Sequence, residues 1–354
     1  MGNNTTNPVY QLVLTKEEGL IAIYGIWMLQ FLIIGLANGL IVAAVLRYEA
    51  LRTRKEYLII LGLTAADVMH LLAYGIGGLY RLFLILMDKF DDSSTVIGCM
   101  ILPQNLLWSW FETTGPLMLV VVSFDRLLSV LIPFRYLSLD QTYAYSLLLV
   151  TYGFGLLVCI SGLGLAVFGQ KDLLPTTAAP CFTGQTYLAV SPYLALYSQY
   201  AGPILGILSV LLYVGVGVVY VRKKNSSLIA KQARQNEETE RQRKLTRSLG
   251  LSCICTLLFL VIPVWLAYTG ESFGWHRLIL QALWLIQNFN PFCNTLIYLK
   301  RQAELRRAVL AMMKCKRMPI NLTLWKEGIR RNNKAMGNRA KSATSPPKSA
   351  TTRF

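Results

Sequence analysis

Residues 115–136 read GPLMLVVVSFDRLLSVLIPFRY, and this stretch places an acid and an arginine, Asp125 and Arg126, directly after a run of apolar residues. The chain has 354 residues, of which 54% are hydrophobic and only 15% are charged. A soluble globular domain usually carries about 25% charged residues. Charge is therefore missing from long stretches of this chain, and Asp125 and Arg126 mark the end of one of them.

Long segments without charged residues divide the chain. A helix needs about 20 apolar residues to cross the hydrocarbon core of a bilayer. Five segments lack Asp, Glu, Lys and Arg: residues 19–46, 141–170, 173–221, 248–270 and 278–299. Two more apolar segments have only a few such interruptions: residues 57–86 with Asp67, His70 and Arg81, and residues 93–124 with Glu112. The sequence thus predicts an all-α membrane protein, a seven-transmembrane helix bundle over residues 20–299.

The two ends of the chain are polar. Residues 1–19 lack a basic stretch before an apolar core, so they are not a secretory signal. The sequons at Asn3 and Asn4 predict a glycosylated extracellular tail, and the alternative interpretation of the MGNNTT start is N-myristoylation. Residues 300–315 mix basic and apolar residues, which predicts a short amphipathic eighth helix with Cys315 as a candidate for palmitoylation. Residues 316–354 are polar and basic, which predicts a disordered cytoplasmic tail.

The net charge of +17 is unevenly placed along the chain. Basic residues are concentrated in the segments 47–56, 221–248 and 300–354, whereas the loops that alternate with these segments carry few basic residues. Because basic loops stay in the cytoplasm, the N-terminus is expected outside and the tail inside, in the plasma membrane. Nucleic acid is not an expected partner, because the basic residues are concentrated in alternate loops and do not form one continuous face.

Two of the seven cysteines fall in the expected outer segments. Cys99 precedes the third span, and Cys181 lies in the loop before the fifth. The oxidising compartment there permits a disulfide bond between them. The cysteines inside the spans are expected to be small packing residues.

Polar side chains inside the spans are the strongest candidates for function, because they are costly in a bilayer. Asn38 and Asp67 lie in the middle of the first and second spans. Asn290, Asn294 and Tyr298 are spaced by four residues, so they share one face of the last span. Pro291 removes a backbone hydrogen bond there and is expected to bend that span. The alternative for each residue is a hydrogen bond that only packs two helices together.

Four segments, taken in order, resemble the rhodopsin-like (class A) family of G-protein-coupled receptors. These are GLANGLIVAAVL at Asn38, LRTRKEYLIILGLTAADVMHLL at Asp67, FDRLLSVLIPFRY at Asp125 and Arg126, and NTLIYLKRQAELRRAVL at Asn294 and Tyr298. The resemblance implies a receptor, not an enzyme, whose partners are an extracellular ligand, a heterotrimeric G protein and an arrestin-type protein. It implies that Asp125, Arg126, Asn294 and Tyr298 serve activation, with Arg126 paired to Asp125 in a part-solvated site. It also implies a polar core of Asn38, Asp67, Asn290 and Asn294 that could hold a sodium ion.

Several positions depart from the family pattern. Leu127 follows Arg126 where the family has tyrosine, Thr295 stands where it has proline, and Val261 stands where its sixth helix has tryptophan. Gly115 replaces a serine of the sodium pocket. The departures are similar to those of nematode-type serpentine chemoreceptors.

Two classes of ligand are disfavoured because the residues that they require are missing. Trp108 stands where amine receptors carry an aspartate, and no lysine between 278 and 299 could serve an opsin. Amine receptors and opsins therefore fit poorly, and the family resemblance implies a chemosensory or neuropeptide-type ligand. Glu112 is the one acid deep in the third span, and it either pairs with a cationic ligand or packs as a neutral carboxyl. The ligand-binding candidates are Gln104, Trp108, Glu112, Thr113 and Trp284.

Other classes of membrane protein fit the sequence less well. A secondary transporter usually carries internal repeats, and the two halves of this chain show none. A transporter or another non-receptor membrane protein also gives no reason for Asp125 and Arg126 ahead of Pro133. No cluster of residues predicts a metal site, because His70 and His276 lie in separate segments.

Overall fold

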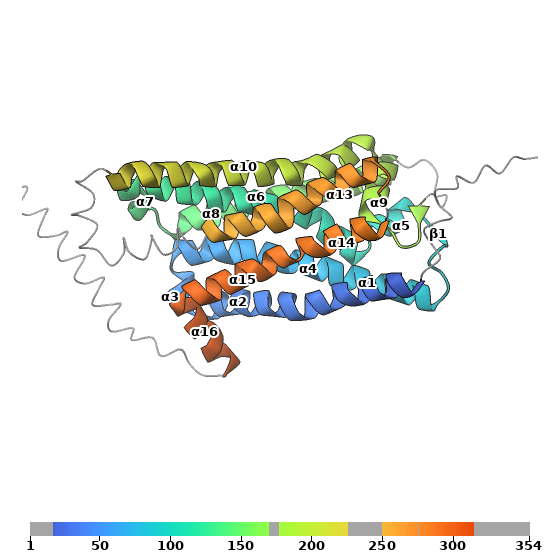
Figure 1. Ribbon diagram of the computed structural model, residues 1–354, viewed down its shortest axis with the longest axis horizontal. Helices are drawn as coiled ribbons and strands as arrows, with labels where there is room; N and C mark the ends of the chain where they lie inside the picture. The colour runs from blue at the N-terminus through green and yellow to red at the C-terminus, as the bar shows by residue number, and fades with distance from the viewer. Residues whose placement is uncertain (1–16, 170–176, 226–249, 276, 315–354) are drawn as a thin grey trace, which may run out of the picture. The chain divides into compact units, whose positions relative to one another are not determined.

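The computed structural model describes residues 17–169, 177–225, 250–275 and 277–314. The chain divides into two units, Met1–Leu310 and Ala311–Phe354, and the membrane-spanning helices all belong to the first. Six helices in the described ranges are long and apolar enough to cross a membrane: Gly19–Arg47, Lys55–Leu86, Pro103–Leu131, Gln141–Gly169, Pro192–Arg222 and Gly250–Gly270. These helices run alongside one another (Figure 1).

Four of these spans are unbroken α-helices, which are α4 (Lys55–Leu86), α6 (Pro103–Leu131), α8 (Gln141–Gly169) and α10 (Pro192–Asn225). The first and sixth spans each contain one π-helical segment. The first consists of α1 (Glu17–Gln30), η1 (Phe31–Gly35) and α2 (Leu36–Arg47), and the sixth ends with η2 (Leu257–Val261) and α13 (Ile262–Ser272).

The segment predicted as the seventh span forms two shorter helices, α14 (Arg277–Gln287) and α15 (Phe289–Arg301), which meet at Asn288. Pro291 has no N–H to bond the carbonyl four residues earlier, so the helix is interrupted there, on the N-terminal side of the proline. The N–H of Asn288 bonds Leu285 O at 3.3 Å instead, and Gln30 Nε2 donates to the same oxygen at 3.2 Å. Asn288 Nδ2 in turn donates to Gln30 Oε1 at 2.8 Å. The expected bend at Pro291 is thus a break three residues earlier, held by a side chain of the first span.

Helix α6 lies at the centre of the bundle, where it packs against α4, α8 and α10. Polar residues of the spans are buried, among them Asn38, Thr64 and Asp67, whereas Leu149 is 75% exposed and Val150 is 69% exposed. This distribution is the reverse of that in a water-soluble protein. It fits helices whose apolar side chains face lipid and whose polar side chains face one another.

One end of the bundle, here called the disulfide end, is closed by short elements. The disulfide bond Cys99–Cys181 joins α5 (Val96–Met100) to the chain before α9 (Thr183–Val190), with 5.2 Å between the Cα atoms. Strands β1 (Ser93–Ser94) and β2 (Thr177–Ala178) pair antiparallel beside it, a small exception to the all-α expectation. The bridge predicted from the sequence is therefore present.

Two buried side chains, Arg81 and Asn105, hold the covering segment, residues 177–182, on the bundle. Arg81 Nε donates to Pro180 O at 3.2 Å, and the Arg81 guanidinium lies 4.8 Å from the centre of the Phe182 ring. Asn105 Nδ2 donates to Cys99 O at 2.8 Å and to Cys181 O at 3.2 Å. Both cysteines of the bridge are thus tied to the first turn of α6.

The opposite end, here called the basic end, carries the short helices α3 (Glu49–Arg52), α7 (Pro133–Ser138) and α16 (Ala303–Met313). Helix α16 follows α15 after a single residue and buries Leu305, Ala308 and Val309. Glu304 accepts hydrogen bonds from Arg54 Nη1 at 2.5 Å and from Tyr57 OH at 3.0 Å. These contacts fix the start of α16 against the second span.

Candidate functional site

The acid and the arginine at the end of α6 form a buried ion pair at the basic end. Arg126 Nε donates to Asp125 Oδ2 at 2.9 Å, and Arg126 Nη2 contacts the same oxygen. The side chains are 1% and 0% exposed. The expectation of a part-solvated pair is therefore wrong, because another side chain covers it.

That covering side chain is Tyr136 of α7. Its hydroxyl accepts a hydrogen bond from Arg126 Nη2 at 2.7 Å and donates to Asp125 Oδ2 at 3.2 Å. Tyr136 ends the segment SFDRLLSVLIPFRY, and Pro133 starts the helix that brings it back over the pair. The proline spacing in the sequence was the available signal for this turn, but it did not identify Tyr136 as a partner.

Lys55, at the start of α4, holds α7 in place. Its Nζ donates to Tyr136 O and to Leu139 O, the latter at 2.9 Å, and lies 4.0 Å from the centre of the Tyr136 ring. A cation at the C-terminal end of a helix is favourable because the last carbonyls lack partners. Sequence reasoning placed Lys55 only among the basic loop residues, and nothing in its neighbours distinguished it.

Two asparagines of α15 pair with two hydroxyls of the sixth span. Thr256 Oγ1 donates to Asn290 Oδ1 at 3.1 Å, and Ser252 Oγ donates to Asn294 Oδ1. Residues four apart lie on one helical face, and the two helices run in opposite directions, so both pairs form at once. We call this set of four residues the hydroxyl–amide ladder. Tyr298, one turn further along α15, also contacts Ser252.

Asp67 lies beside the ladder, where its carboxyl contacts the Asn294 amide. The other predicted member of this polar core, Asn38, bonds within its own helix, from Nδ2 to Ile34 O at 2.9 Å. The structure therefore brings together Asp67, Asn290 and Asn294, while the side-chain hydrogen bond of Asn38 lies within the first span.

The surroundings of Asp67 offer few ligands to a sodium ion. At Gly115, the position on α6 where a hydroxyl would be needed, an added Cβ would lie 2.4 Å from Phe111 Cε2. The Phe111 ring occupies that space and stacks on His70, with 4.0 Å between ring centres. The amide oxygens of Asn290 and Asn294 already accept hydrogen bonds from the sixth span. Sodium binding stays a prediction that this set of side chains does not favour.

Glu112 is held between three helices near the disulfide end. Ser198 Oγ of α10 donates to Glu112 Oε1 at 2.5 Å. Trp108 on α6 and Tyr187 on α9 also contact the carboxyl group. Tyr187 is fully covered, so α9 reaches from the covering segment down to this acid. A buried carboxylate needs such donors, because an ionised oxygen without them is strongly disfavoured.

Of the other ligand-binding candidates, Thr113 and Trp108 lie near Glu112, Trp284 contacts Trp108, and Gln104 lies apart from these residues. Thr113 Oγ1 lies 2.9 Å from Tyr197 OH, one residue from the Glu112–Ser198 contact on both helices. The Trp108 and Trp284 rings meet edge to face at 6.3 Å between centres. Gln104 lies apart from them, buried beside Gly77 of α4. We call Trp108, Glu112, Thr113, Tyr187 and Ser198 the Glu112 cluster.

Three predicted modification sites lie outside the described residues. They are the glycosylation sites Asn3 and Asn4 and the palmitoylation candidate Cys315.

Comparison with known families gives one match. The family model described as 7 transmembrane receptor (rhodopsin family) matches residues 37–298. The matched residues include Asn38, Asp67, the buried ion pair and the hydroxyl–amide ladder, and they end at Tyr298. Comparison with curated proteins gives no match.

Proposed function

Because this chain belongs to the rhodopsin family of seven-transmembrane receptors, we propose that it binds a chemosensory or neuropeptide-type ligand from outside the cell and activates a heterotrimeric G protein. Family membership makes it a multi-pass membrane receptor with a G protein as its kind of partner. The basic end is then cytoplasmic, because basic loops are retained there. The disulfide end is extracellular, as is the N-terminal tail.

The observation that carries the proposal is the covered ion pair at the basic end. Arg126 is 1% exposed and has Asp125 and Tyr136 as partners, so in this arrangement it cannot contact a protein docked on that face. A buried arginine that only stabilised the fold would have little reason to lie at a helix end next to the surface. We infer that the arrangement is the resting state, and that activation releases Arg126 from Asp125 and Tyr136 while the sixth span moves outward.

Extracellular recognition is assigned to the Glu112 cluster. Its acid accepts a hydrogen bond from Ser198 of α10 and is contacted by Tyr187 of α9, and Trp108 extends the cluster toward Trp284 of α14. A cationic group of a ligand could replace these donors and pull α10 or α9 away from α6. An arrestin-type protein is a further proposed partner, through the polar tail, whose serines and threonines are candidate phosphorylation sites.

The receptor function is tested by a G-protein activation panel. We expect purified receptor in lipid nanodiscs to accelerate GTPγS uptake by at least one of the Gs, Gi, Gq and G12 heterotrimers. Small-molecule and peptide libraries should contain members that increase the rate further. Uptake equal to that with empty nanodiscs for all four heterotrimers, with and without both libraries, would contradict the proposal.

Glu112→Gln tests the ligand contact. The substitution keeps the shape of the side chain and one acceptor oxygen for Ser198, and it removes the charge. For a cationic agonist from the libraries, we expect the midpoint of the dose–response curve to rise by about tenfold or more, since charge pairs away from water contribute about 1.5 kcal/mol or more. The measurement is made at matched surface expression.

The control for this substitution is Glu49→Gln, which removes an exposed acid at the opposite end of the bundle. It should leave the midpoint unchanged. If Glu112→Gln also leaves the midpoint and the maximal response unchanged, Glu112 is a neutral packing group and the ligand contact lies elsewhere.

A further inference from the structure

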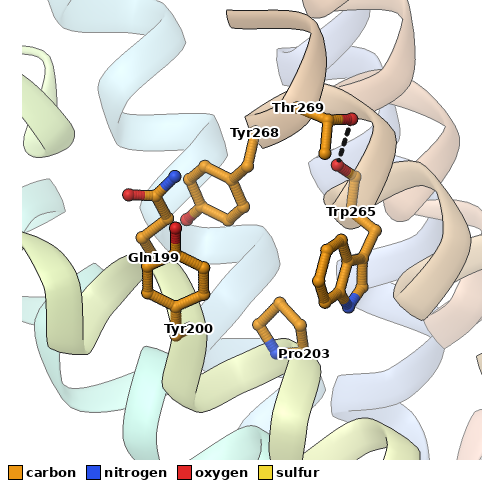
Figure 2. A pocket seen from close by; sticks show the side chains of 6 residues that line it. All are labelled: Gln199, Tyr200, Pro203, Trp265, Tyr268 and Thr269. Atoms are coloured by element: carbon orange, nitrogen blue, oxygen red, sulfur yellow. Dashed lines mark hydrogen bonds between the residues drawn. The ribbon is translucent and has the colours of Figure 1, made fainter. Parts of the chain in front are cut away.

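A pocket separate from the Glu112 cluster lies between α10 and α13, in the half of the bundle nearer the disulfide end (Figure 2). It holds about 320 Å³ of empty space, part of which is open to the outside. Its lining residues are Gln199, Tyr200, Pro203, Trp265, Tyr268 and Thr269.

The mouth of this pocket faces lipid. Tyr200 is 44% exposed, and it lies in one row of α10 with Leu196 and Ile204, which are also exposed. Trp265 is 40% exposed on α13, next to the exposed Leu266. Both helices cross the membrane, so these surfaces contact acyl chains and not water. A molecule would therefore enter the pocket from the bilayer.

The polar part of the pocket is uncharged. Figure 2 shows the Gln199 amide and the hydroxyls of Tyr200 and Tyr268 gathered on one side of the space. Within the described part of the chain, no side-chain hydrogen bond is formed by Gln199 or Tyr200. An amide without a partner is costly where lipid replaces water. A ligand that offers a hydroxyl group would relieve this cost.

The rest of the pocket is built from rings. Tyr200, Pro203, Trp265 and Tyr268 present flat surfaces around the space. Among the described residues, neither a lysine nor an arginine lines it, so a phosphate headgroup would find no cation there. A plain acyl chain, in turn, would leave the amide unpaired. A rigid, flat, apolar body with one hydroxyl group satisfies both parts of the lining.

We propose that the pocket between α10 and α13 binds a sterol-class lipid drawn from the bilayer. Its hydroxyl group bonds Gln199 and the two tyrosines, and its ring system lies against Pro203 and Trp265. The site adjoins the Glu112 cluster, because Ser198 of that cluster precedes Gln199. In addition, the Tyr268 ring meets Trp284 at 5.6 Å, and Trp284 in turn contacts Trp108 of the cluster. Lipid bound at this site therefore affects both the Glu112 cluster and the movement of the sixth span.

The test is photolabelling of the full-length receptor in nanodiscs with a diazirine-bearing cholesterol analogue. Labelled peptides are mapped by mass spectrometry. We expect label in the segments 192–205 and 257–270, and we expect excess cholesterol to reduce it at least fivefold. Gln199→Leu removes the amide and Thr269→Phe fills the mouth, and each should lower the competed label by a similar factor. Tyr193→Phe, an exposed residue of the same helix outside the pocket, should not.

A parallel arm uses a photoreactive phosphatidylserine. We expect it to label lipid-facing residues without competition by cholesterol. The proposal is overturned if the cholesterol label is spread over all exposed helical faces, if excess cholesterol does not displace it, or if phosphatidylserine competes equally for 192–205 and 257–270. It is also overturned if both pocket variants, folded as judged by their thermal transitions, keep the full competed label.

Discussion

Removal of the two hydroxyls of the hydroxyl–amide ladder is expected to raise G-protein activation in the absence of agonist. Ser252 and Thr256 are the donors that join the sixth span to Asn294 and Asn290 of α15. Outward movement of the sixth span, as proposed for activation, would separate these pairs. The combined substitution Ser252→Ala with Thr256→Val therefore weakens the resting arrangement more than the active one.

The size of this effect follows from the strength of such bonds. Hydrogen bonds between membrane helices contribute about 0.6 kcal/mol on average and about 1.7 kcal/mol at most. Two of them sum to about 1.2 kcal/mol, which shifts an equilibrium between two states about sevenfold. We expect basal GTPγS uptake to rise by a factor of about three to ten at equal receptor concentration.

The matched control is Thr151→Val on α8, whose hydroxyl donates to the carbonyl of Leu147 in its own helix at 2.8 Å. This substitution should leave basal uptake unchanged. Basal uptake of the double variant at or below the wild-type rate, with a normal thermal transition, would show that the ladder does not restrain the sixth span.

The ladder also shows what the sequence could not predict. Asn290 and Asn294 were recognisable as polar residues on one face of an apolar span, but their partners were not. A serine or threonine in a membrane helix usually bonds a carbonyl of the preceding turn, as Thr151 does here. Ser252 and Thr256 therefore carry no distinguishing mark until the two helices are placed side by side.

The spans and the disulfide bond were predictable for a simple reason. The absence of charge over about 20 residues is a local property of the chain, and so is the placement of Cys99 and Cys181 at one end of the bundle. The break at Asn288 depends on more than Pro291, because Gln30 of the first span supplies the bond that stabilises it. Burial of the ion pair likewise depends on Tyr136, ten residues after Arg126, and on Lys55, which anchors the Tyr136 helix.

Replacement of Arg126 with alanine is expected to abolish activation and also to destabilise the receptor. The family resemblance implied a role for Arg126 in activation, but Arg126 also bears on folding, because Asp125 is 0% exposed and Arg126 is the cation bonded to it. Truncation of one partner of a buried ion pair usually costs about 3–5 kcal/mol, because the remaining charge stays away from water. On the Ser252→Ala and Thr256→Val background, whose basal uptake is expected to be raised, Arg126→Ala should reduce GTPγS uptake to that of empty nanodiscs.

Loss of signal through misfolding and loss through coupling are separated by a second variant. Asp125→Asn combined with Arg126→Gln leaves two neutral side chains that can still bond Tyr136, so most of the lost thermal stability should return. Uptake should stay absent, because the guanidinium that a G protein would contact is missing. Arg135→Ala, which removes an exposed arginine of α7, should change neither property. Full uptake by the neutral double variant would mean that the charge at the end of α6 anchors the helix and takes no part in coupling, and the proposed receptor mechanism would lose its main support.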